Sequence, residues 1–105
     1  MGLKIYWTEF SEKELYKIFE YYREKASYRI AKQIVDGIYN ETQNLKKQAK
    51  IGQVEELLKD RNQEFRYLVF KNYKIIYWIN TQENRIEIND IFDTRQNPTK
   101  ITRTK

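Results

Sequence analysis

The sequence over residues 66–98 reads RYLVFKNYKIIYWINTQENRIEINDIFDTRQNP, and this stretch decides the fold. Three runs rich in β-branched and aromatic residues alternate with short polar pieces, which is the pattern of strands joined by turns. Consecutive strands on such short connections form an antiparallel meander. The predicted strands are residues 65–70, 73–79 and 85–92, and the predicted connections are residues 71–72 and 81–84.

The residues that precede this stretch predict one more strand and the first of two helices. Leu3, Ile5 and Trp7 alternate with polar neighbours, as in a half-buried strand. A helix is then expected to begin at Ser11, because Glu14 lies three residues on and completes a capping box. A stripe of apolar residues at helical spacing continues that helix, and it consists of Leu15, Ile18, Phe19 and Tyr22.

A second helix is expected after a break at Ser27. Its predicted buried face consists of Ala31, Ile34, Val35, Ile38, Thr42 and Leu45. Gly37 inside this helix costs about 1 kcal/mol relative to alanine, so packing must hold the helix together. Two amphipathic helices in succession predict an αα-hairpin. Residues 49–63 are mostly polar and predict a loop, with Gly52 as a turn residue.

This order of elements predicts an α+β fold. It consists of an N-terminal strand, an αα-hairpin and a three-stranded antiparallel meander, with the helix pair packed on one face of a small sheet. A chain of 105 residues is normally one domain, here residues 1–105. Pro98 is expected to end the ordered pattern, which leaves a flexible tail from about residue 99.

Composition excludes several kinds of chemistry. Cysteine and histidine are absent, so disulfides, thiolate metal sites and histidine bases are excluded. With three glycines, the chain has no glycine-rich phosphate loop. We therefore expect no cofactor and no metal. The N-terminus lacks the pattern of a signal peptide, and no apolar run approaches a membrane span, so a cytoplasmic protein without membrane contact is expected.

The charge of the chain is concentrated in its C-terminal half. The formal net charge is +5, and residues 61–105 hold 9 Lys and Arg against 5 Asp and Glu, whereas residues 1–60 hold 11 against 10. A basic surface attracts nucleic acid, anionic lipid or an acidic protein. The alternative is a charged surface that only keeps the protein soluble.

Four cations accompany the aromatic residues of the predicted sheet. These binding candidates are Arg66, Lys71, Lys74 and Arg95. If the strands form a meander, Arg66 and Lys74 are expected to share one face of the sheet. Such a face would suit a polyanion or an acidic protein, although ordinary solvated charge on the open face of the sheet would look the same.

The order of elements and several of these residues resemble the RelE/ParE superfamily of type II toxin–antitoxin toxins. The resemblance covers nearly the whole chain and is strongest in FRYLVFKNYKIIYWI, with an Arg-x-Leu-Val pattern followed by Tyr-Lys-Ile-x-Tyr. The segment IYWTEFSEKEL is similar to the opening strand and helix start of the family. RIEINDIFDTRQNP is similar to its last strand and closing Arg-x-x-Pro.

The resemblance implies a bacterial growth inhibitor that a cognate antitoxin neutralises in a toxin–antitoxin hetero-oligomer. ParE-like members poison DNA gyrase, and RelE-like members cleave mRNA on the ribosome. A ribonuclease would use cations to stabilise the phosphate transition state together with an acid/base pair. The resemblance makes Arg66, Lys74 and Arg95 catalytic candidates, with Tyr77 as a candidate acid or base.

Three functions remain open at this point. The tail lacks the Tyr or His found in many cleaving members, and the TRQNP ending is closer to the ParE-like pattern, so gyrase poisoning is favoured. A RelE-like, ribosome-dependent mRNA endoribonuclease is the alternative. An inactive module that only binds its antitoxin is the second alternative.

Overall fold

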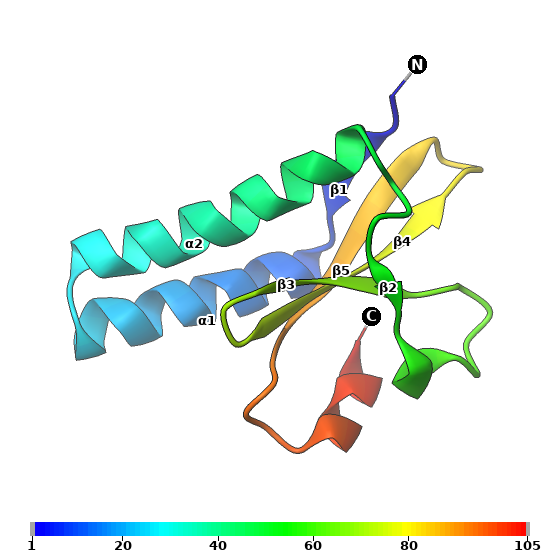
Figure 1. The fold of residues 1–105 in the computed structure, drawn as a ribbon. Coiled ribbons are helices and arrows are strands. Elements are labelled where there is room, and N and C mark those ends of the chain that lie inside the picture. The colour runs from blue at the N-terminus through cyan, green and yellow to red at the C-terminus, as the bar shows by residue number, and fades with distance from the viewer. Residues whose placement is uncertain (1, 105) are drawn as a thin grey trace.

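The computed structural model describes residues 2–104, and Figure 1 shows their fold. The strands are β1 (Lys4–Trp7), β2 (Gln53–Val54), β3 (Arg66–Phe70), β4 (Tyr73–Asn80) and β5 (Arg85–Asp93). The α-helices are α1 (Glu9–Lys25) and α2 (Tyr28–Gln43). Three 3₁₀-helices complete the chain, namely η1 (Asn44–Lys46), η2 (Glu56–Leu58) and η3 (Pro98–Arg103).

The sheet has five strands in the order β1-β5-β4-β3-β2. The predicted meander of β3, β4 and β5 is confirmed, and β1 pairs with β5 in parallel. The sequence missed β2, which lies in the stretch that was expected to be a loop. Two residues of that stretch, Gln53 and Val54, pair antiparallel with Tyr67 and Arg66, so a short edge strand forms without an apolar signature.

Helix α1 begins two residues before the predicted start. Thr8 is the N-cap, and its hydroxyl oxygen accepts a hydrogen bond of 3.1 Å from the backbone N–H of Ser11. The expected capping box at Ser11 is therefore wrong, because the residue that leaves β1 already caps the helix. Glu14 is instead buried and forms ion pairs with Lys17 and Arg103.

Helix α2 begins where the sequence predicted, with Ser27 as its N-cap. Most of the predicted face is buried, but Val35 turns outward into a groove between the two helices. Gly37 is explained by packing: a Cβ at this position would lie 2.2 Å from the Phe70 ring. Phe70 of β3 therefore packs directly against the helix backbone.

A bulge in β5 decides which of its residues face the helices and which face the opposite side of the sheet. Ile76 of β4 pairs with Asp90 while the next residue, Tyr77, pairs with Ile88, so Asn89 is extra. Before the bulge Ile88 faces the helices, and after it Ile91 does. The opposite face is packed by a second cluster consisting of Leu58, Phe65, Ile76, Phe92 and Ile101.

The C-terminal segment packs on the sheet, although the sequence suggested that order ends at Pro98. Residues 98–103 form η3, and Ile101 is 1% exposed. Arg103 donates to Asp90 and forms an ion pair with Glu14, so it ties η3 to both β5 and α1. Figure 1 shows η3 on the side of the sheet away from the hairpin. Within residues 2–104, no helix is long and apolar enough to cross a membrane.

Truncating Ile101 tests whether this segment belongs to the fold. We expect Ile101→Ala to lower the free energy of unfolding by about 2–4 kcal/mol, because it leaves a cavity in the second cluster. Urea denaturation measures the loss, and exposed Lys100→Ala is the control. A loss no larger than that of the control would show that η3 adds nothing to stability.

Candidate functional site

Arg66 and Tyr77 lie opposite each other on β3 and β4, on the face of the sheet that packs against the helices. The Tyr77 side chain is fully buried; its hydroxyl donates to the Ala49 carbonyl at 2.8 Å and accepts from the Gly52 N–H at 2.9 Å. Burial raises the pKa of the Tyr77 phenol. Arg66 donates to the Gly52 carbonyl at 2.9 Å and pairs with Glu64. Both side chains thus hold residues 49–52 against the sheet.

Gly52 is required at this point by close approach. A Cβ there would lie 2.6 Å from the Tyr77 hydroxyl oxygen and 2.7 Å from the Tyr67 carbonyl oxygen. The sequence predicted Gly52 as a turn residue, and in the structure its lack of a side chain also leaves room for the buried Tyr77 hydroxyl.

Lys74 lies on the other face of the sheet. Its ammonium group is 2.7 Å from a carboxylate oxygen of Glu55, whose side chain is 3% exposed, and 4.2 Å from the centre of the Tyr67 ring. The expectation that Arg66 and Lys74 share a face is wrong. The register pairs Arg66 with Tyr77, three residues from Lys74, so alternation places the two cations on opposite faces.

Lys71 and Arg95 lie together at one end of the sheet. Lys71 occupies the turn between β3 and β4 with a φ of 52°, and Asn72 beside it accepts a hydrogen bond from the Thr94 N–H and donates one to Asp93. The Arg95 side chain is 60% exposed and paired with Asp93. This guanidinium, the main cause, holds the pKa of the Asp93 carboxyl below its usual range.

The five predicted residues therefore occupy three places. Arg66 and Tyr77 lie on the face that packs against the helices, and Lys74 lies on the opposite face, where it pairs with Glu55. Lys71 and Arg95 lie at one end of the sheet. The exposed pair can contact an anionic target. Among residues 2–104, no group of three or more acidic side chains is arranged to hold a metal ion.

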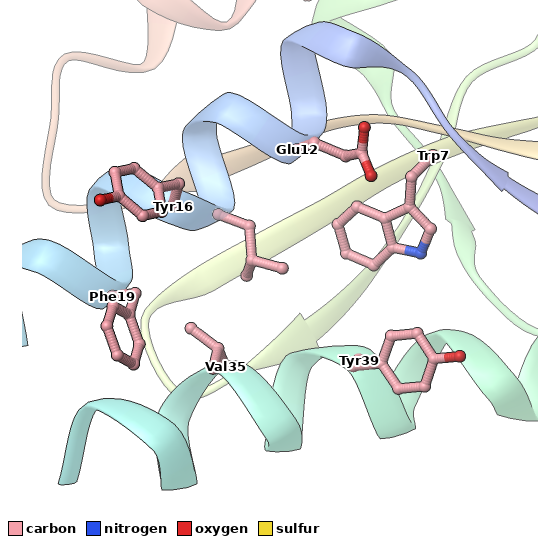
Figure 2. A pocket seen from close by; sticks show the side chains of 7 residues that line it. Trp7, Glu12, Tyr16, Phe19, Val35 and Tyr39 are labelled. Atoms are coloured by element: carbon pink, nitrogen blue, oxygen red, sulfur yellow. The ribbon is translucent and has the colours of Figure 1, made fainter. Parts of the chain in front are cut away.

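A second surface, which the sequence did not reveal, lies between α1 and α2. This hairpin groove has a volume of about 330 Å³ and is lined mainly by apolar and aromatic side chains. Figure 2 shows its lining between the two helices, with a strand of the sheet behind. The lining residues are Trp7, Glu12, Leu15, Tyr16, Phe19, Val35 and Tyr39.

The hairpin groove is unusually exposed for so apolar a surface. Tyr16 and Tyr39 keep 62% and 50% of their surface exposed. The indole N–H of Trp7 is buried and has no hydrogen-bond partner among residues 2–104. A buried donor without a partner costs about 1–3 kcal/mol, which is tolerated more readily at a functional surface than in a core. The sequence pattern had placed Val35 on the buried face of the second helix and Tyr16 and Tyr39 outside the predicted buried faces, so it did not bring these residues together.

Comparisons with known proteins place this fold. The family model described as the ParE toxin of type II toxin–antitoxin systems, parDE, matches residues 5–98. A solved structure of the chromosomal ParDE toxin–antitoxin system from P. aeruginosa is similar with a TM-score of 0.72 and 17% sequence identity, over 88% of this chain and 96% of that chain. No curated protein matches the sequence.

The Lys74–Glu55 pair provides a test of structural against functional roles. We expect Lys74→Met to lower the free energy of unfolding by about 3 kcal/mol, because the Glu55 carboxylate then remains buried without its partner. The double variant Lys74→Met with Glu55→Gln removes that charge and keeps an acceptor for the Leu57 N–H, so it should recover most of the loss. Chemical denaturation measures both, and equal stabilities for the single variant and the unmodified protein would contradict the structural role.

Proposed function

The chain belongs to the family of ParE toxins of type II toxin–antitoxin systems, and from this membership we propose that it stops bacterial growth by poisoning DNA gyrase. The observation that carries the proposal is the match of the ParE family over residues 5–98, which include both α-helices and all of the sheet except Lys4. The RelE-like alternative is not favoured, because the matching family is the ParE one. Gyrase and its DNA would be met in the cytoplasm.

The exposed cations support contact with an anionic target. Gyrase acts on DNA, a polyanion, and a basic surface is attracted to such a complex over several ångströms of solution. Lys71 and Arg95 lie at the end of the sheet with exposed side chains, whereas Arg66 and Lys74 are used within the fold. We assign target recognition to Lys71 and Arg95, with Arg66 and Lys74 shaping the sheet that presents them.

A cognate antitoxin is proposed as the partner that neutralises the toxin. The similar P. aeruginosa structure is that of a toxin–antitoxin system. In this chain the hairpin groove is the surface suited to a protein segment, because an apolar groove between two helices receives the apolar face of an amphipathic helix. The complex would be a toxin–antitoxin hetero-oligomer.

Expression of the chain alone and with the gene next to its own tests the function. We expect the chain alone to stop growth, the neighbouring gene to restore it, and the purified toxin to inhibit gyrase supercoiling or accumulate cleaved DNA. Cleavage of mRNA on programmed ribosomes with gyrase unaffected would contradict the gyrase proposal. Normal growth with a folded protein would support an inactive antitoxin-binding module.

Charge removal at the end of the sheet tests the recognition surface. We expect Lys71→Ala with Arg95→Ala to lower gyrase inhibition about tenfold or more. Thermal stability should change little, because the Lys71 side chain is exposed and an exposed ion pair such as Arg95–Asp93 contributes only about 0–1 kcal/mol. Lys25→Ala with Arg29→Ala at the hairpin tip is the matched control, since it removes the same charge elsewhere. Equal inhibition by the two double variants would show that only net charge matters.

A further inference from the structure

One end of the hairpin groove is built from aromatic ring faces and a carboxylate. The rings of Trp7 and Tyr39 are parallel within 15°, with centroids 6.4 Å apart. Figure 2 shows them side by side between the helices, with the Glu12 carboxylate beside Trp7. We call Trp7, Tyr39 and Glu12 the platform. Ring faces carry partial negative charge, so the platform is a cation-attracting surface on a basic protein.

No lysine or arginine side chain of residues 2–104 lies over Trp7 or Tyr39. Six cation–ring contacts form elsewhere among these residues, including Lys74 on Tyr67 and Arg85 on Tyr6. Three other carboxylates of α1 form ion pairs: Glu9 pairs with Lys13, Glu14 with Lys17 and Glu20 with Arg23.

Glu12 differs from these neighbours. Its carboxylate has no hydrogen bond or ion pair with any described residue, and it lies in the groove rather than on the solvated side of the helix alone. Glu12 can provide a charge partner, and the two rings beside it, over which no lysine or arginine of residues 2–104 lies, can provide a stacking surface for a planar cation.

We propose that the platform binds an arginine side chain of the antitoxin. This inference rests on the proposed toxin–antitoxin function and specifies its contact. A guanidinium can stack on the rings and donate two parallel hydrogen bonds to Glu12, which an ammonium or an apolar side chain cannot do. The other end of the groove, formed by Leu15, Phe19 and Val35, takes an apolar side chain about one helical turn away on the same segment.

The arginine would fix register and partner choice. The toxin carries a net charge of +5 and attracts acidic segments, so an arginine on such a segment needs an acidic contact, which Glu12 provides. A segment that is shifted by one turn would place its arginine among the apolar residues at the other end of the groove and lose both the stacked contact and Glu12, which gives the platform a role in specificity.

The toxin alone provides the first test, because its two tryptophans report on different faces. Trp7 lies in the platform, whereas the Trp78 indole N–H is bonded to Glu87 on β5. We expect titration with N-acetylarginine amide to shift the indole N–H resonance of Trp7 and not that of Trp78, and Glu12→Gln to weaken this binding. A larger Trp7 shift with N-acetylleucine amide, or no shift with either amide, would overturn the proposal.

Binding of the purified product of the neighbouring gene provides the second test. We expect Glu12→Gln and Glu12→Leu to weaken its binding about tenfold, with Tyr39→Leu doing the same and Tyr39→Phe nearly nothing. Glu24→Gln, which removes an exposed carboxylate of the same helix outside the groove, is the control. Tighter binding by the Glu12→Leu variant, or unchanged affinity of the Tyr39→Leu variant, would indicate that an apolar side chain occupies the platform and would overturn the proposal of an arginine.

The two tests separate this inference from the function on which it rests. If the neighbouring gene product binds and neutralises the toxin, but the Glu12 and Tyr39 variants bind it normally, the arginine contact is wrong and the toxin–antitoxin function stands. If the arginine amide binds at Trp7 but the gene product does not bind the toxin, the antitoxin assignment fails, and with it the role given to the platform.

Discussion

The single extra residue in β5 is the constraint on which the rest of the structure depends. Without the bulge at Asn89, alternation would turn Asp90 toward the helices and Ile91 away from them. With it, Ile91 joins the helix-side core and Asp90 meets Arg103 and the Thr104 hydroxyl. The bulge therefore decides which residues of β5 join each of the two cores. It also creates the buried anchor that holds the C-terminal segment on the sheet.

Cations with similar sequence surroundings have different tasks because of where the register places them. Arg66 and Lys74 hold residues 49–58 against the sheet, Arg66 through the Gly52 carbonyl on one face and Lys74 through Glu55 on the other. Lys71 and Arg95 stay accessible because they follow strand ends, where backbone turns outward. The residues proposed for recognition therefore lie at the rim of the sheet, and the cations in the strand interiors hold the fold. The hairpin groove, which is proposed for the antitoxin, is lined by other residues.

The meander, the helix pair and their order follow from period and composition, because burial of alternate or every third to fourth residue leaves a direct trace in sequence. The strands at residues 66–70, 73–80 and 85–93 were predicted almost to the residue. Features set by main-chain pairing or by single long-range contacts left no such trace. These include β2, the bulge and the burial of η3. The groove was missed because Trp7 and Tyr39 come together only after the hairpin has folded back onto β1.

The parallel pairing of β1 with β5 has a consequence for how the toxin is made. Lys4 pairs with Arg85, 81 positions later, so the first strand of residues 2–104 pairs with the last one. Contacts between residues so far apart in sequence form late and slowly, because the chain must lose the entropy of closing a long loop before the favourable contacts form. A chain still under synthesis has neither the central order of the sheet nor the anchor for η3. We expect the nascent toxin to be inactive until β5 has been synthesised and can pair with β1.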